Sequence, residues 1–196
     1  MDKTYTSTLI RDLLYQIEGK PLRSDLEETP DRVVRALEEL LDGYSVDIPA
    51  LFTAFDDEES VPKNNHTGLH DQIVAVRGIE CWSWCEHHIL PFHIRASVAY
   101  LPKDKVIGAS KIPRLVLAYA HRLQLQERIT RQVANAIMDN LEPYGVAVIL
   151  VGEHSCMRIR GVKSESSQLV TSVMLGAFRD NQSTRLEVLS LLGLKE

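Results

Sequence analysis

The grouping of strand-like and helix-like segments along the chain is the feature that most constrains its fold. Residues 94–101 alternate between two sets of side chains with a period of two, which predicts a β-strand. Residues 146–151 form an unbroken apolar run, which predicts a buried strand that we expect to continue through Arg160. The other regular segments follow in order: a strand-like run over 72–76, helices over 111–122 and 126–141, a strand-like run over 169–178 and a helix over 181–192. Segregated blocks of this kind predict an α+β fold with an antiparallel sheet rather than alternating βαβ units.

The first 70 residues have a different pattern. Apolar residues at helical spacing predict a helix over 4–18. A second helix is expected to start at Thr29, as N-cap, with Pro30 at its first position, and to stop near Gly43. Residues 44–70 contain prolines, glycine and a run of four acidic residues, which predict a loop. We therefore expect an N-terminal helical arm and linker over 1–70 and a main domain over 71–196.

Composition excludes several classes of protein. The chain has 196 residues, of which 44% are hydrophobic and 25% charged, values that argue against disorder. No apolar run reaches the ~18 residues of a membrane span, and the N-terminus lacks the pattern of a signal peptide, so a cytoplasmic location without membrane contact is expected. A net charge of −5 argues against a nucleic-acid surface. Three cysteines are too few for a disulfide framework.

The densest chemical signal is the segment Cys85-Glu86-His87-His88. A cysteine and a histidine three residues apart, Cys85 and His88, can both reach one zinc ion. His154 and Cys156 would point to the same face of a strand, so that strand could offer an imidazole and a thiolate to the same ion. Three protein ligands with an open fourth position are typical of a catalytic zinc site. The alternative is a set of ordinary buried thiols and histidines, which is the interpretation we give to Cys81.

Two histidines beside this predicted metal site, His87 and His154, are not needed as ligands. They are candidates for proton transfer, since histidine changes its charge near neutral pH.

Basic residues gather at the start of the predicted helix 111–122. Ser110 stands at its cap position, and Lys111 and Arg114 add positive charge where helix N–H groups bind anions. Arg160 lies four residues beyond Cys156, on the same face if the strand continues. In an acidic chain this pattern indicates a polyphosphate next to the metal; solvated surface residues are the alternative.

Gln126 and Glu127 begin the next predicted helix. A carboxylate there could accept two N–H groups from a guanine-like edge. Alone, it is also the acidic first-turn residue that the helix dipole favours.

Taken together, these segments resemble the GTP cyclohydrolase I family over residues 25–192. The motifs that carry the resemblance are TPDRV at 29–33, CEHH at 85–88, YLPKDKVIGASKIPR at 100–114, RLQLQERIT at 122–130, HSCMRIRG at 154–161 and VTSVMLGAF at 170–178. Several long motifs in the same order make the match specific.

The resemblance implies the tunnelling fold, in which a four-stranded antiparallel sheet with two helices assembles into an oligomeric barrel. It implies a homodecamer of two pentamers with active sites shared between subunits. The implied reaction converts GTP to 7,8-dihydroneopterin triphosphate with release of formate. That product supplies tetrahydrofolate, biopterin or 7-deazaguanine biosynthesis.

The resemblance also assigns roles to single residues. The zinc ligands would be Cys85, His88 and Cys156, with water in the fourth position as the source of the hydroxide that attacks C8. The other implied roles are proton transfer by His87 and His154, assistance to the ribose rearrangement by Ser110, guanine binding by Glu127 with Gln126, and triphosphate binding by Lys111, Arg114 and Arg160, with Arg32 from a neighbouring subunit.

Two other functions remain open at this point. One is a different tunnelling-fold enzyme acting on a pterin or deazapurine, although such enzymes use a three-histidine zinc site or a nucleophilic cysteine elsewhere. The other is a metal-stabilised oligomer that binds nucleotides without turnover, which would not need both His87 and His154.

Overall fold

The computed structural model describes residues 1–52, 54–56, 72–103 and 105–193. Contacts divide the chain into two compact units, Met1–Asp42 and Gly43–Glu196. Most of the predicted linker and the greater part of its acidic run lie outside the described residues. No helix in the described part of the chain is both long and apolar enough to span a membrane.

The first unit is a pair of helices, α1 (Lys3–Glu18) and α2 (Thr29–Leu40), as the sequence predicts. Asp2 caps α1 by accepting a hydrogen bond from the backbone N–H of Tyr5. Thr29 is the first helical residue of α2 rather than its N-cap, which is Glu28. The predicted stop residue, Gly43, lies beyond the helix end in a 3-10 turn, Asp42–Ser45.

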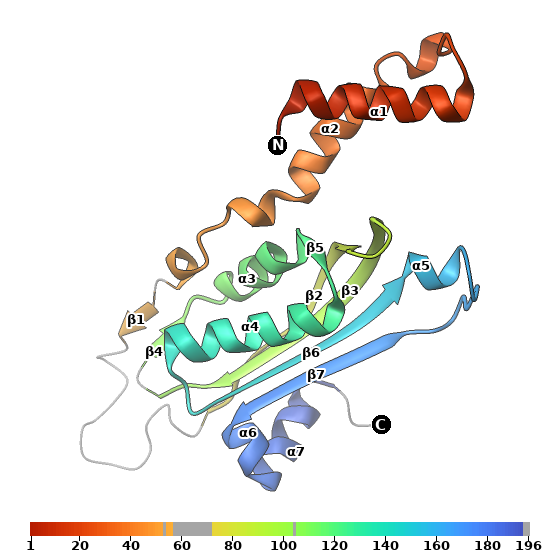
Figure 1. The fold of residues 1–196 in the computed structure, drawn as a ribbon. Helices are drawn as coiled ribbons and strands as arrows, with labels where there is room; N and C mark the ends of the chain where they lie inside the picture. The colour runs from red at the N-terminus through yellow and green to blue at the C-terminus, as the bar shows by residue number, and fades with distance from the viewer. Residues whose placement is uncertain (53, 57–71, 104, 194–196) are drawn as a thin grey trace. The chain divides into compact units, whose positions relative to one another are not determined.

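The second unit is built on a five-stranded sheet with the order β5-β2-β3-β6-β7 (Figure 1). The strands are β2 (Val74–Cys85), β3 (Leu90–Leu101), β5 (Leu123–Gln124), β6 (Gly145–His154) and β7 (Leu169–Gly176). The four long strands are antiparallel, and β5 adds a short parallel pairing beside the end of β2. The predicted α+β class and the antiparallel pairing of four strands are therefore confirmed, whereas the fifth, short parallel strand β5 was not predicted. A separate two-stranded sheet joins β1 (Ala54–Asp56) to β4 (Lys105–Ile107).

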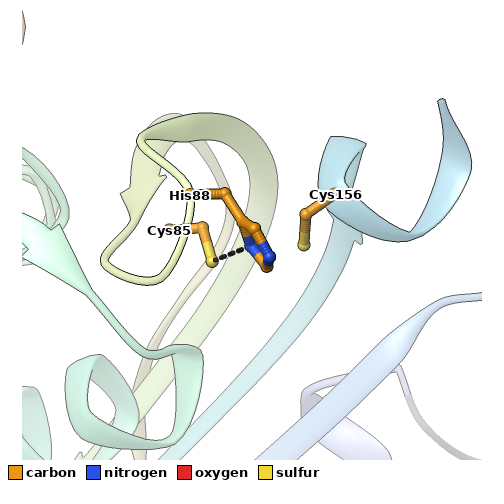
Figure 2. Close-up of side chains that lie close together, drawn as sticks. All are labelled: Cys85, His88 and Cys156. Atoms are coloured by element: carbon orange, nitrogen blue, oxygen red, sulfur yellow. Dashed lines mark hydrogen bonds between the residues drawn. The ribbon is translucent and has the colours of Figure 1, made fainter. Parts of the chain in front are cut away.

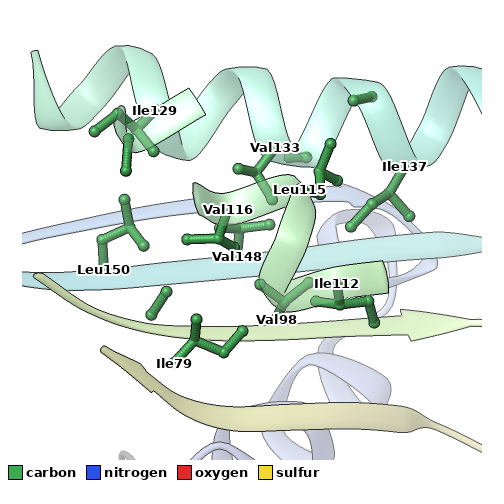
Figure 3. Packing of buried hydrophobic residues seen from close by; sticks show 14 of the residues in the cluster. Ile79, Val98, Ile112, Leu115, Val116, Ile129, Val133, Ile137, Val148 and Leu150 are labelled. Atoms are coloured by element: carbon green, nitrogen blue, oxygen red, sulfur yellow. The ribbon is translucent and has the colours of Figure 1, made fainter. Parts of the chain in front are cut away.

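Helices cover both faces of this sheet. On one face lie α3 (Lys111–Ala120) and α4 (Gln126–Leu141), and their apolar side chains form the main core with alternate residues of the strands (Figure 3). On the other face lie α6 (Ala177–Asp180) and α7 (Gln182–Leu191). The alternation is visible within β6: Val148 packs in the main core, whereas Ile149 packs with Phe178 and Val188.

The predicted continuation of the strand through Arg160 is wrong. β6 ends at His154, and residues Ser155–Arg158 form a single helical turn, α5. Pairing with β7 stops at Gly152, and pairing with β3 stops at His154, so the following backbone has no neighbouring strand. The chain satisfies its own hydrogen bonds instead, with the N–H of Ile159 donating to the carbonyl of Ser155 at 3.0 Å. His154 and Cys156 therefore do not share a strand face.

Candidate active site

The turn between β2 and β3 holds the Cys-Glu-His-His motif. Cys85 is the last residue of β2, and its carbonyl accepts hydrogen bonds from the N–H groups of His88 (3.2 Å) and Ile89 (2.8 Å). These bonds close a tight turn, in which Ile89 takes a positive φ of 53°. The turn folds His88 back over Cys85, and its Nδ1 lies 3.6 Å from the Cys85 Sγ.

Cys156 completes the predicted group from the other side. The last β3–β6 pair joins Phe92 to His154, so the end of β6 lies beside the β2–β3 turn, and α5 then projects Cys156 toward it (Figure 2). The ligand atoms of Cys85, His88 and Cys156 all lie within 4.8 Å of one another. The structure therefore brings the three predicted ligands together, although by a helical turn rather than by a strand.

The chemistry of this donor set fits zinc. Two thiols and one imidazole are the soft and borderline ligands that zinc takes in a tetrahedral shell, and three of them leave one position open. Burial raises the pKa of the Cys156 thiol, and the neighbouring Cys85 raises it further, because two thiolates repel each other. A divalent cation would remove this repulsion. Cys81 lies outside the group, and burial raises the pKa of its thiol to about 12, as expected for an inert core residue.

His154 lies beside this group without belonging to it. Its ring is stacked on Phe92, with the ring centroids 4.3 Å apart and the planes inclined by 9°. Burial lowers the pKa of His154, an effect that the carboxylate of Glu127 opposes. His87 also lies outside the group; it is exposed and meets the ring of His88 edge-on. Both predicted proton-transfer residues are thus separate from the predicted metal ligands.

The two residues predicted to bind a guanine edge differ in their surroundings. Glu127 is exposed in the first turn of α4. The side chain of Gln126, by contrast, is 0% exposed, and its amide forms hydrogen bonds within the protein, including one in which its Oε1 is the acceptor and the Nε2 of His154 lies 3.0 Å away. This side chain therefore has no free edge for a ligand.

One ion pair of the site was not predicted from the sequence. Arg128 of α4 forms a two-pronged ion pair with Glu86 in the β2–β3 turn, which holds the pKa of the Glu86 carboxyl below its usual range. The pair joins the turn to the start of α4. Each residue stands beside a predicted site residue in sequence, but nothing local in the sequence relates two side chains 42 residues apart.

Three of the predicted ribose- and phosphate-binding residues, Ser110, Lys111 and Arg114, lie at the start of α3. The end of α3 lies against β2, where the Ser83 hydroxyl donates to the Ala120 carbonyl at 2.6 Å. Ser110 and Lys111 stand at the other end of this ten-residue helix, about 14 Å away along its axis. Arg114 is exposed one turn into the same helix.

Two further arginines complete the predicted set. Arg160 is exposed and lies close enough to Cys156 for its charge to lower the pKa of that thiol slightly, against the larger effect of burial. Arg32 belongs to the first unit, where it is exposed and forms an ion pair with Glu28 at 2.7 Å.

Comparisons with known proteins show which proteins the chain resembles. A family model described as GTP cyclohydrolase I matches residues 6–193. A GTP cyclohydrolase 1 of Leptospira biflexa is 47% identical over 184 residues, which cover 94% of this chain and 96% of that protein. A GTP cyclohydrolase 1 of Thermoanaerobacter pseudethanolicus is 41% identical over 197 residues, with complete coverage of both chains. A solved structure of an archaeosine synthase QueF-Like in the apo form has a TM-score of 0.42 at 17% identity and covers 54% of this chain and 92% of that one, which supports no further conclusion.

Proposed function

Because the chain belongs to the GTP cyclohydrolase I family of enzymes, we propose that it hydrolyses GTP at C8 and rearranges the ribose, giving 7,8-dihydroneopterin triphosphate and formate. The observation that carries the proposal is the Cys85–His88–Cys156 group with His154 beside it. It is the arrangement expected of a hydrolytic metal centre with a proton carrier. The product would supply tetrahydrofolate, pterin or 7-deazaguanine biosynthesis.

The three ligands would hold a zinc ion. Zinc in such a site acts as a Lewis acid that activates water for attack on C8 of the purine. The chain itself contributes the arrangement of the ligands: the hairpin turn fixes Cys85 and His88, and the end of the sheet fixes the start of α5.

Proton transfer during ring hydrolysis and ribose opening is assigned to the two histidines that are not ligands. Burial lowers the pKa of His154, which favours the neutral ring that can accept a proton and return it. His87 is exposed beside His88 and can exchange protons with solvent.

Glu127 would bind the guanine edge through its exposed carboxylate. Lys111 and Arg114 would bind the triphosphate through their positive charges at the start of α3, with Arg160 beside the Cys85–His88–Cys156 group. Ser110 makes no side-chain cap hydrogen bond to the helix, which leaves its hydroxyl available for the ribose.

An assembly of several copies would bring these residues together. Because α3 separates Lys111 from the β2–β3 turn, we propose that one GTP is bound by the metal group and Arg160 of one copy and by Lys111, Arg114 and Arg32 of other copies. Within the described residues β7 pairs only with β6, and β2 pairs with β5 only through Trp84 and Cys85, so the sheet has open edges on both sides. Pairing of such edges between copies would close a barrel, and we propose a homodecamer.

The test is direct. The zinc-loaded protein is incubated with GTP, and formate and the absorbance of a dihydropterin are followed with and without a chelator. Cys85→Ser should lose both zinc and turnover, whereas the matched control Cys81→Ala should keep both, because Cys81 lies outside the metal group. Absence of formate release from GTP, or a Cys85→Ser variant with normal zinc and turnover, would contradict the proposal.

A further inference from the structure

The side-chain amide of Gln126 is held in one orientation by its surroundings. Its nitrogen faces two backbone carbonyls, those of Leu150 at 3.1 Å and Leu169 at 2.9 Å. Carbonyl oxygens can only accept hydrogen bonds, so the group that faces them must be the NH₂ end of the amide.

A pair of threonines adds a third acceptor. The hydroxyl of Thr130 donates to the Gln126 carbonyl in the α4 backbone at 2.8 Å, so its proton is already used. In the 2.6 Å contact between Thr130 and Thr171, the proton must therefore come from Thr171. This leaves the oxygen of Thr171 to accept from the Gln126 nitrogen at 3.1 Å. Every neighbour of this nitrogen is an acceptor, and the amide has no alternative orientation.

The fixed orientation of the Gln126 amide determines which ring nitrogen of His154 carries the proton. Since the nitrogen of Gln126 faces its three acceptors, its Oε1 faces the Nε2 of His154 at 3.0 Å, and an oxygen requires a proton on that Nε2. The neutral ring must then carry its proton on Nε2. Nδ1 has no partner among the described residues.

We infer that Gln126 is a positioning residue that holds His154 as the Nε2–H tautomer, so that Nδ1 is the atom that exchanges a proton with the substrate. The inference rests on the proposed reaction. Because Nε2 holds its hydrogen in the bond to Gln126, Nδ1 is the ring atom whose lone pair can accept a proton from the substrate and return it. The Nε2–H bond to Gln126 persists throughout, so the ring keeps its orientation on Phe92.

Gly152 provides the space in which this hydrogen bond forms. A Cβ atom at residue 152 would lie 1.9 Å from the Gln126 Oε1 and 3.3 Å from the His154 Nε2. Neither side chain can withdraw freely, because the amide of Gln126 is fully buried with its nitrogen bound and His154 is stacked on Phe92. An added methyl group would therefore break the contact without changing either partner.

The test combines spectroscopy and kinetics on the zinc-loaded, full-length protein. Solid-state ¹⁵N NMR of histidine-labelled protein distinguishes protonated from unprotonated ring nitrogens, and the His154 signals are identified by their absence from a His154→Phe sample. We expect a protonated Nε2 in the wild type. We expect Gln126→Met and Gly152→Ala to shift the proton toward Nδ1 and to lower kcat by about 10- to 100-fold, the effect of a buried N–H that loses its acceptor. KM for GTP should change by less than about twofold, because no interaction with substrate is removed.

A matched control is available on the same helix. Gln132 also bonds another side chain, accepting from Gln124 at 2.8 Å, but it does not contact His154. Gln132→Met should leave kcat and the His154 spectrum unchanged. If Gln132→Met lowers kcat as much as Gln126→Met, a general effect on α4 explains the loss and the inference is wrong.

Three other results would overturn the inference that Gln126 positions His154. They are a wild-type His154 with its proton on Nδ1, a Gln126→Met variant with normal kcat, and a Gln126→Met variant in which only KM rises. The last result would indicate that Gln126 contacts the guanine. The NMR result does not depend on turnover. A wild-type protein that shows the Nε2–H tautomer but releases no formate from GTP would therefore contradict the proposed function and not the tautomer assignment.

Discussion

Two inactive chains should restore activity to each other if each site is built between copies, and the fold specifies which pairs can do so. The ligand atoms of Cys85 and Cys156 belong to one group within a chain. Lys111 stands at the far end of α3, about 14 Å from the end that lies against β2. We therefore propose to co-express a Lys111→Ala chain with a Cys156→Ser chain, each carrying its own tag, and to purify assemblies that contain both tags.

The expected size of the rescue follows from the assortment of chains. Lys111→Ala alone should lose about 10- to 100-fold in kcat/KM, the effect of losing a hydrogen bond to a charged group, and Cys156→Ser should lose its zinc. If the two residues that serve one GTP come from different copies, random mixing in equal amounts leaves about one quarter of the sites intact. Recovered activity should then approach one quarter of the wild-type value, well above either parent. If both residues come from one chain, every site lacks one of them.

The assay is formate release from GTP, with zinc measured on the same samples. A mixture of Cys85→Ser with Cys156→Ser provides the matched control, because one chain must supply both thiolates of a metal group, so no rescue is expected. A mixture of Arg32→Ala with Arg160→Ala tests the shared site from the N-terminal arm. Activity no greater than that of the parents in doubly tagged Lys111→Ala/Cys156→Ser assemblies would refute the shared site, and rescue in the cysteine mixture would refute a metal group formed within one chain.

The remaining predictions concern the metal, the turn and the core. Burial and a neighbouring thiol raise the pKa of Cys156, so zinc must displace a proton from this thiol when it binds. For each proton displaced, zinc affinity should fall by up to about tenfold for each unit by which the pH is lowered. Calorimetry in buffers of different ionisation enthalpy measures both the affinity and the number of protons released. Glu86→Gln should weaken zinc binding by about 10-fold, as measured by competition with a chromophoric chelator, because it removes the ion pair with Arg128. The double exchange Glu86→Arg/Arg128→Glu re-forms this ion pair with the charges reversed and should restore part of the lost zinc affinity. Ile137→Ala, which removes a 0% exposed side chain between α4 and the sheet, should lower the free energy of unfolding in urea by about 2–5 kcal/mol, whereas the exposed Leu186→Ala should change it by less than about 0.5 kcal/mol.

Much of the fold follows from local patterns in the sequence. The predicted helix over 126–141 has the bounds of α4, because its apolar stripe has one period throughout and Pro143 prevents continuation. The grouping of strands and helices gave the antiparallel sheet for a similar reason: antiparallel neighbours need only short connections, so strands that follow one another along the chain pair with one another.

The end of β6 shows where local patterns fail. The segment from His154 to Arg160 alternates as a strand would, yet strand geometry also requires a neighbour for the backbone hydrogen bonds. Pairing of β6 with β7 ends at Gly152, and pairing with β3 ends at His154. Where these two strands end is determined by other parts of the chain. The grouping of Cys85, His88 and Cys156 could be predicted, because zinc takes thiolate and imidazole ligands. The helical turn that carries Cys156 could not be predicted, because it depends on where β3 and β7 end.

Interactions between distant residues were also beyond the sequence. Gln126 and His154 are 28 residues apart, and Glu86 and Arg128 are 42 apart. A glutamine at a helix start next to a glutamate suggests a ligand contact, which is the role predicted for Gln126. Only the fold shows that this side chain points inward to two carbonyls, whereas Glu127, one residue along the helix, is exposed.

The register of the central strands therefore matters as much to the site as the residues that form it. Cys85 is the last residue of β2, His154 the last of β6 and Gln126 the first of α4, so each stands where regular backbone pairing stops but remains attached to a rigid element. A slip of one residue between β3 and β6 would move His154 to the opposite face of the sheet, because side chains alternate with a period of two. It would separate His154 from Gln126 and displace α5, with Cys156, from the hairpin turn. The apolar side chains that fix this register by packing under α3 and α4 thus hold His154 and Cys156 in place.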